Sequence, residues 1–474
     1  MNTFVDQTMN KTARTRRSFS LKRVFPLFLA ALSVLVVCSG CVSGYAERLR
    51  EVRRDYYDVG DLEQAKTALE RRQKRSPQRE KDVLALDEAC LELFSGNIVG
   101  AKEKLLQARD SFDAIEEKRI QQSTENLLSY WTDDNINSYA GEDYEKILIR
   151  ATLAIADLFD GEKDAQAYAY QITAKQNEII QNGFIEDPRN KGQRINPKKA
   201  YPRVPLGPYI EGLLWEKTYI NASDAARCYE KVVNWQPNFK QGRQDLVRAQ
   251  TSVHSQPGNG RVYVFAFVGR GPYKEQVYEE ATQFALLLAD QVFSATNKYS
   301  VPPTIAPVPV PSLVINESNV KSVGINIDGE NKGETETIAD VNSMAVKQYE
   351  AVKDQILAKA VVRRVVKKGS IYAAKEVGQV NDWVNLAMDV GGIVWEATES
   401  ADTRCWALLP GKIQVASFEI PVGEHKLTMC PCDLQGRKIG VPLTAKVNVN
   451  ANQNTYVLVN YPDREPIGKA VVSK

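Results

Sequence analysis

Histidine is almost absent from this sequence of 474 residues, which contains only His254 and His425. A metal site built from several histidines, or a catalytic triad that uses one, therefore has almost no raw material. The sequence also lacks a Gly-x-Ser-x-Gly elbow, a His-Glu-x-x-His helix and a phosphate loop ending in Gly-Lys-Ser/Thr. These absences favour a protein with no catalytic residues, no metal and no cofactor, and so one that is not an enzyme.

Excess charge and long apolar runs are lacking as well. The formal net charge is +2, which argues against a nucleic-acid-binding protein built on a basic surface. The apolar run over residues 24–37 has fourteen residues, whereas a transmembrane helix needs about 20. Six basic residues and one acidic residue precede this run, an order that is typical of a secretory signal.

The apolar run ends in Cys38-Ser39-Gly40-Cys41. Small residues before a cysteine resemble the lipobox of bacterial lipoproteins, in which the last cysteine is acylated and the signal is cleaved before it. We therefore predict a lipoprotein signal peptide over residues 1–40 and an acyl anchor such as palmitate on Cys41. An ordinary signal peptide with a chance cysteine is the alternative. Removing residues 1–40 would change the net charge from +2 to −3, so we expect no nucleic-acid partner.

The residue after the lipobox bears on the location of the protein. Val42, and not aspartate, follows Cys41, so the inner-membrane retention signal of enterobacteria is absent. We expect a protein of the bacterial cell envelope that its lipid holds at the outer membrane, facing the periplasm. The inner membrane is the alternative.

A helical repeat occupies the first half of the chain. Segments that begin at Gly60 and Gly96 align 36 residues apart, close to the 34-residue period of tetratricopeptide repeats (TPR). Three copies share a small residue followed four positions later by a large one, as in that repeat, and in the first and third copies a proline then ends the helix. The copies are Ala65, Leu69 and Pro77; Ala101, Leu105 and Ala108; and Ala225, Tyr229, Val232 and Pro237. We predict a TPR-like helical repeat domain over residues 41–255, with a generic helical bundle as the alternative.

Repeats of this kind stack into a concave surface that binds other proteins. Candidate positions on it are Tyr56, Leu62, Leu93 and Tyr229, although packing between helices explains them equally well. Residues 182–208 are rich in Pro, Gly and Lys and predict a long loop. We expect a periplasmic or membrane protein as the partner of the repeats.

A break at Gln256-Pro257-Gly258-Asn259-Gly260 separates the second half. We predict a mixed α+β domain over residues 256–474. Residues 261–268 predict a strand that is buried on both faces. The glycine-containing stretch 269–274 predicts a structural turn, and not a phosphate site, before a helix over residues 275–295.

Beyond this helix the pattern alternates between strands and one long helix. The prolines between residues 302 and 311 predict an extended segment, as polyproline or an edge strand. Residues 322–338 predict a hairpin, and residues 340–375 predict an amphipathic helix with a basic face. Residues 405–462 predict four strands in a small β-sandwich-like lobe. The expected fold is therefore α+β, with a helical TPR-like solenoid first and this mixed domain after it.

The remaining cysteines leave their pairing open. Cys90 and Cys228 lie in helical patterns and are typical of buried thiols. Cys405, Cys430 and Cys432 are candidates for a disulfide from Cys405 to one of the other two, or for free thiols. A zinc set that adds His425 is a weaker alternative, because one residue between two cysteines is short for a zinc knuckle.

An acid, an arginine and a tryptophan lie close together at Asp402, Arg404 and Trp406. Asp402 and Arg404 can form an ion pair, and Trp406 can bury its ring at the base of a sheet. We expect a structural corner. The alternative is a binding or catalytic site, in which case the chain would be an envelope enzyme that acts on glycan or peptide.

This stretch, together with Leu-Pro-Gly-Lys-Ile-Gln-Val and Pro-Val-Gly-Glu-His after it, resembles a poorly characterised family of bacterial lipoproteins. Residues 269–274 and the basic stretch 363–367 share the resemblance, which extends in order over most of the chain. Members join a lipobox and tetratricopeptide-like helices to a C-terminal α+β domain. The resemblance implies an envelope protein and offers no agreed reaction.

Overall fold

The computed structural model describes residues 44–125, 131, 139–217, 219–296, 299–302, 305–377 and 400–473. The predicted signal peptide and Cys41 lie outside these residues. The chain is a mixed α+β protein, about 50% helical and 23% strand, with several sheets. This confirms the predicted fold class at that level. No helix among the described residues is both long and apolar enough to cross a membrane.

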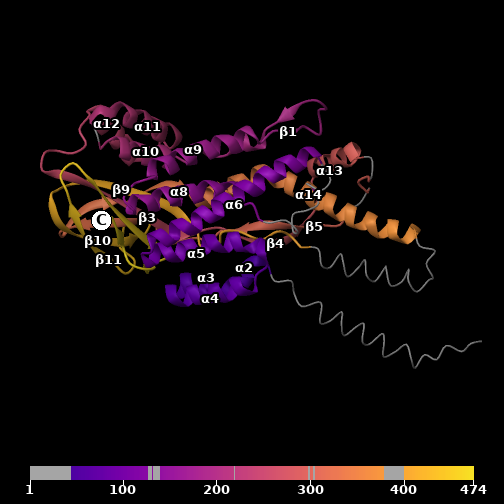
Figure 1. Ribbon diagram of the computed structural model, residues 1–474, viewed down its shortest axis with the longest axis horizontal. Helices are drawn as coiled ribbons and strands as arrows, with labels where there is room; N and C mark the ends of the chain where they lie inside the picture. The colour runs from indigo at the N-terminus through magenta and orange to yellow at the C-terminus, as the bar shows by residue number, and fades with distance from the viewer. Residues whose placement is uncertain are drawn as a thin grey trace, which may run out of the picture.

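Helices form the first half of the chain, and each long helix packs against the next (Figure 1). Asp61 begins one of them by accepting a hydrogen bond from the backbone N–H of Gln64 at 2.9 Å, and Gly96 ends another in the left-handed conformation. The elements are α2 (Tyr45–Arg48), α3 (Arg50–Arg54), η1 (Asp55–Val59), α4 (Leu62–Arg75), η2 (Gln78–Glu80), α5 (Lys81–Ser95), α6 (Ile98–Glu125), α8 (Asp143–Phe159), α9 (Ala165–Gln181), α10 (Leu206–Trp215), η4 (Tyr219–Asn221), α11 (Ala222–Trp235) and α12 (Lys240–Gln250).

The apolar repeat positions all lie inside this helical layer. Each is at most 1% exposed, namely Ala65, Leu69, Ala101, Leu105, Ala108, Ala225, Tyr229 and Val232. Pro77 and Pro237 follow the ends of α4 and α11, as the pattern predicts. A solenoid of the tetratricopeptide kind stays a prediction. The loop after α9 contains a small hairpin of β1 (Ile185–Glu186) and β2 (Arg194–Ile195), then η3 (Pro197–Ala200).

Two sheets pack face to face in the second half. The five-stranded sheet has the order β13-β12-β3-β9-β8, and the four-stranded sheet has the order β11-β10-β6-β7. The strands are β3 (Asn259–Arg270), β6 (Ser322–Ile327), β7 (Glu330–Glu334), β8 (Glu336–Asp340), β9 (Pro410–Pro421), β10 (Gly423–Cys432), β11 (Leu443–Val449), β12 (Asn454–Tyr461) and β13 (Val471–Val472). β3 is the central strand, parallel to β12 and antiparallel to β9.

The two faces of β3 belong to two different cores, which confirms the prediction that both are buried. Val262, Val264, Ala266 and Val268 pack against the four-stranded sheet. Tyr263, Phe265 and Phe267 pack in the core of the helical layer, where the Phe267 ring lies 5.5 Å from that of Phe94 in α5. The helical half and the five-stranded sheet therefore share one hydrophobic core.

The expected lobe over residues 405–462 needs correction, because its four strands do not form a unit of their own. β9 and β12 flank β3 in one sheet, whereas β10 and β11 join β6 in the other. The hairpin expected over residues 322–338 is shorter than predicted. β6 and β7 turn at Asp328-Gly329, and β8 crosses to the five-stranded sheet. The sandwich is thus assembled from strands on both sides of the long helix.

The helix predicted over residues 275–295 begins later. Its first part is β4 (Tyr273–Glu279), which pairs with β5 (Val308–Val314), and the helix α13 covers Gln283–Thr296. Pairing with a distant strand overrides the local helical pattern here. β5 is the proline-rich segment, and α14 (Val341–Val377) covers it. The hydroxyl of Tyr349 donates to the carbonyl of Pro311 at 2.8 Å, and Arg364 donates to the carbonyl of Pro307 at 2.8 Å.

Candidate functional site

Asp402 and Arg404 form the ion pair that the sequence predicts. The Arg404 Nε donates to Asp402 Oδ1 at 2.8 Å, and its Nη2 donates to Oδ2 at 2.6 Å. The Arg404 backbone N–H also donates to Oδ1 at 3.1 Å. Both carboxylate oxygens of Asp402 therefore accept hydrogen bonds from Arg404, which is only two residues away in the chain.

The pair is largely buried, which indicates a structural role. Arg404 is 5% exposed, donates to the backbone carbonyl of Arg79 at 3.4 Å and lies 5.3 Å from the ring centre of Tyr139. Burial alone would raise the pKa of Asp402, but the Arg404 guanidinium holds that pKa below its usual value. We conclude that the pair joins residues 400–409, which we call the 400–409 segment, to the helical layer.

Trp406 is completely buried, as expected for a structural corner. Its indole N–H finds no oxygen acceptor and lies beside the Cys90 thiol. Its backbone N–H donates to Glu145 Oε1 at 2.7 Å. The ring thus fills the shared core while a buried carboxylate of α8 holds the backbone.

Two buried carboxylates complete this arrangement, and the sequence analysis missed both. Oδ1 of Asp87, in α5, accepts the backbone N–H groups of Ala407 at 2.9 Å and Leu408 at 3.0 Å. Asp87 and Glu145 are both 0% exposed, and burial raises the pKa of each. The sequence signal for Asp87 was an acid on the apolar side of the mostly hydrophobic stretch 83–94. It accepts hydrogen bonds from irregular backbone, which no repeat pattern predicts.

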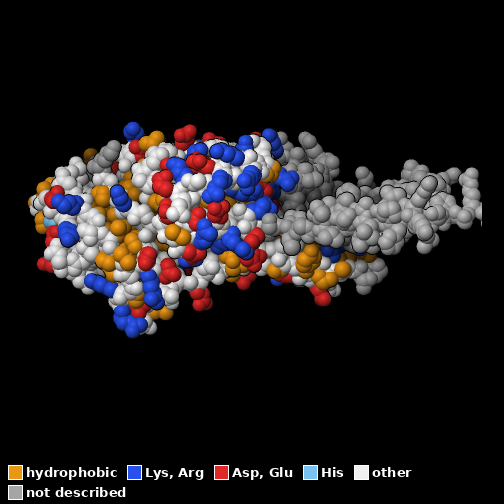
Figure 2. All heavy atoms as spheres, turned by 90° about the horizontal axis from the view of Figure 1, so that it is seen from below, with side chains coloured by type: hydrophobic (Ala, Val, Ile, Leu, Met, Phe, Trp, Pro, Cys, Tyr) orange, Lys and Arg blue, Asp and Glu red, His pale blue; other side chains and the backbone are white. Residues whose placement is uncertain are grey.

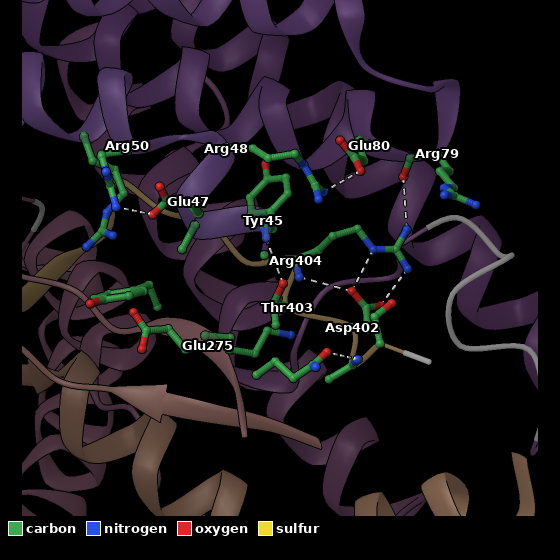
Figure 3. Close-up of a pocket in the computed structure, with 18 residues that line it drawn as sticks. Tyr45, Glu47, Arg48, Arg50, Arg79, Glu80, Glu275, Asp402, Thr403 and Arg404 are labelled. Atoms are coloured by element: carbon green, nitrogen blue, oxygen red, sulfur yellow. Dashed lines mark hydrogen bonds and ion pairs between the residues drawn. The ribbon is translucent and has the colours of Figure 1, made fainter. Parts of the chain in front are cut away.

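A cavity of about 590 Å³ opens beside the 400–409 segment (Figure 3). Its walls come from the start of α2, the turn at η2, β4 and the residues before Arg404. The charged residues that line it are Glu47, Arg48, Arg50, Arg53, Arg79, Glu80, Lys274, Glu275, Asp402 and Arg404. No stretch of sequence contains this site, because four distant segments build it. Gly44, the first described residue, lies in its wall.

Ion pairs fix part of this lining. Arg48 donates to Glu80 at 2.9 Å, and Arg50 donates to Glu47 at 2.7 Å. Arg53 differs, because its guanidinium lies 3.8 Å from the ring centre of Tyr273 and its buried Nε has no hydrogen-bond partner. A stacked arginine beside an aromatic ring suits a planar or anionic group on a partner.

Lys274 is the buried cation at the inner wall. It is 4% exposed and donates to Glu142 Oε1 at 2.6 Å. Burial alone would lower the pKa of this amine, but the carboxylates of Glu142 and Asp402 hold it above its usual value. Two smaller cavities, of about 200 and 240 Å³, also reach Lys274 from the side of α14. Lys274 therefore lines all three cavities and places a positive charge between them.

The five cysteines among the described residues are free thiols. Cys90, Cys228, Cys405, Cys430 and Cys432 are all buried and unpaired, so the disulfide from Cys405 does not form in this structure. Cys405 belongs to the core of the helical layer, whereas the other two candidates lie on β10. Burial raises the pKa of Cys405 to about 12, which disfavours a reactive thiolate. The described residues hold no cluster of three or more His, Cys, Asp or Glu suited to a metal.

The candidate positions on the concave repeat surface are not accessible. Tyr56, Leu93 and Tyr229 are at most 1% exposed, and Leu62 packs against the same core. The Tyr56 hydroxyl accepts from Asn460 of β12 at 2.8 Å, so the five-stranded sheet occupies the face that was expected to bind a partner.

The described residues thus form a charged cavity next to the 400–409 segment, in which the Asp402 carboxylate already has hydrogen-bond partners. Comparison with protein-family models, with curated proteins and with solved structures finds no match to this chain.

Proposed function

We propose that the chain is a lipid-anchored protein of the bacterial envelope that binds a periplasmic or membrane protein without catalysing a reaction. The proposal includes acylation of Cys41, TPR-like helices as the scaffold, and kinship with the lipoprotein family that the sequence resembles. The observation that carries it is the cavity beside Gly44, because a charged hollow with a stacked arginine lies three residues from the proposed anchor.

The partner site differs from the one expected of a repeat scaffold. The inner face of the helices packs on the protein's own sheet, so we assign the cavity, and not the concave face, to the partner. Its volume of about 590 Å³ falls within the range of about 300–1,000 Å³ that is usual for binding pockets. Its lining of arginines, acids and Tyr273 suits a short polar segment of another protein.

The enzyme alternative receives less support from the same geometry. A general acid or base needs an oxygen or nitrogen that can reach a substrate. Both oxygens of Asp402 accept hydrogen bonds from Arg404, and Trp406 is 0% exposed. Asp402, Arg404 and Trp406 therefore pack and hold the 400–409 segment.

Position-specific crosslinking in intact cells tests the partner site. A photoreactive amino acid at the exposed, cavity-lining Glu275 should give a discrete crosslinked species. The same group at the exposed Glu465, after β12, is the matched control and should give none. Adding Arg53→Glu should abolish the product from position 275. An identical product from both positions, or none from position 275, would show that the cavity is not the partner site.

The anchor is tested separately. Cys41→Ala should leave a precursor that takes up no labelled palmitate and is not retained as a processed membrane protein. A variant that still incorporates the label would overturn the assignment of Cys41.

A further inference from the structure

Four exposed cations lie together where α4 ends and α5 begins. They are Lys74, Arg75, Arg79 and Lys81, and none forms an ion pair with a residue that the structure describes. We call them the α4 basic cluster. Two neighbouring acids pair with other cations, because Glu80 accepts from both Arg48 and Arg72, and Glu51 pairs with Arg71. Glu70 and Asp82 are the remaining acids close by in the sequence, against four cations. The cluster therefore presents an excess of positive charge to its surroundings.

The cluster lies next to the point where the chain enters the fold. Glu80 joins the two regions, since it pairs with Arg48 of α2 at 2.9 Å and Arg72 of α4 at 2.5 Å. Arg79 and Gly44 line the same cavity. Figure 1 places α2 beside the C-terminal end of α4 on the lower side of the molecule, and Figure 2 shows lysines and arginines on that face with acidic side chains among them.

Chain length limits how far this face can be from the lipid. Two residues lie between Cys41 and Gly44, and a fully extended chain covers at most about 3.6 Å per residue, or roughly 11 Å over these three steps. Charges act over about 8 Å at physiological ionic strength. An acyl anchor on Cys41 would therefore hold the cavity wall at Gly44, and the adjoining cluster, close to lipid headgroups.

We propose that the α4 basic cluster docks on the anionic headgroups of the membrane that carries the anchor. The inference rests on the proposed acylation of Cys41 and adds a second, electrostatic contact to it. Basic residues close to a membrane supply such a contact on anionic surfaces. The contact orients the end of α4 and the start of α5 toward the headgroups and leaves the β-sandwich away from them.

The net charge of the protein makes the test specific. The chain without residues 1–40 carries −3, so general attraction to anionic vesicles is not expected. Any binding has to come from a local cluster. The acyl group can be left out by using the chain from residue 42 onward, which contains every described residue, so that vesicle binding reports the basic cluster alone.

The measurement is cosedimentation with vesicles of phosphatidylcholine, with and without about one third phosphatidylglycerol. We expect binding to the anionic vesicles only, and weaker binding as salt is added. Each basic residue near such a surface contributes roughly a fivefold change in partitioning. The variant Lys74→Gln, Arg75→Gln, Arg79→Gln, Lys81→Gln should then lose affinity by roughly two orders of magnitude or more.

A matched variant controls for overall charge. Lys240, Lys426, Lys438 and Arg464 are also exposed, and they lie on or beside α12, β10 and β12. Changing these four to glutamine alters the net charge equally and should leave vesicle binding unchanged. Both variants should keep the denaturation midpoint of the parent chain.

Two results would overturn the proposal. Equal losses in the two variants would show that total charge, and not this cluster, governs binding. No binding of the parent chain to anionic vesicles would remove the docking surface outright. Neither result bears on palmitate labelling of Cys41, so failure of the cluster and failure of the anchor are distinguishable.

Discussion

Asp87 provides the sharpest test of how the 400–409 segment is held. One oxygen, Oδ1, accepts the backbone N–H groups of Ala407 and Leu408, and Oδ2 has no hydrogen-bond partner. Asp87→Ala would strand both donors in the core, at about 1–3 kcal/mol each, so we expect a loss of about 2–6 kcal/mol in the free energy of unfolding. Asp87→Asn keeps the accepting oxygen, and we expect a change of about 1 kcal/mol or less.

The pH dependence separates the acceptor from the charge. Burial raises the pKa of Asp87 in the folded protein, whereas the unfolded chain ionises near its usual value of about 4. The folded state then holds more protons than the unfolded state between these two values. Stability contributed by Asp87 is therefore present below about pH 4 and declines as the pH rises, by up to about 1.4 kcal/mol per unit. Asp87→Asn lacks this dependence.

Urea unfolding of the wild type and both variants, followed by tryptophan fluorescence from pH 4 to 8, measures these effects. The wild type should lose stability relative to Asp87→Asn as the pH rises. Equal losses in the alanine and asparagine variants would show that the backbone acceptor is unimportant. A wild type that gains on Asp87→Asn with rising pH would show a lowered pKa and refute the reasoning.

Four further outcomes can be measured on the same protein. Arg404→Ala should cost on the order of 3 kcal/mol in urea unfolding, because it leaves Asp402 partly buried without its cation; a shift near zero would contradict the buried pair. Trp406→Ala should cost roughly 3–5 kcal/mol by opening a cavity in the shared core, whereas Trp406→Phe should cost less. Five thiols should titrate in denaturant without reductant on the chain from residue 42, and a count of three would reveal a disulfide. Cleavage within residues 256–260 should not yield two pieces with independent melts, because Phe94 and Phe267 lie in one core; two separate transitions would disprove this.

The expectation that the two halves do not melt independently is the opposite of what the sequence favours. The break at residues 256–260 has the composition of a linker, and each half is long enough to bury a core of its own. Yet β3 follows the break with three aromatic residues on one face, and the helices supply the surface that covers them. Alternation along β3 predicts that both faces are buried but not what buries them. Only the tertiary arrangement identifies the helical layer as the second partner.

The local sequence pattern predicted an element correctly where that element is determined by its own residues. The burial of Ala225, Tyr229 and Val232 and the long helix after residue 340 follow from helical periodicity. It failed at β4, whose partner Val308–Val314 lies about 30 residues away, and at the strands of residues 405–462, which are divided between two sheets. Register and sheet membership depend on contacts between distant segments, which a single sequence does not encode locally.

The corner at Asp402, Arg404 and Trp406 shows why site and scaffold look alike in a sequence. Charged and aromatic residues crowd a stretch without regular structure when they meet a ligand, but also when buried backbone needs partners. The 400–409 segment is of the second kind, because the oxygens of Asp402 are occupied and Glu145 and Asp87 satisfy its N–H groups. Outside this motif, Lys74, Arg75, Arg79 and Lys81 lie close to one another and form no ion pair with a described residue. A binding surface is therefore expected where charged side chains lack ion-pair partners among the described residues, as on the face beside Gly44, and not simply where polar residues are dense in the sequence.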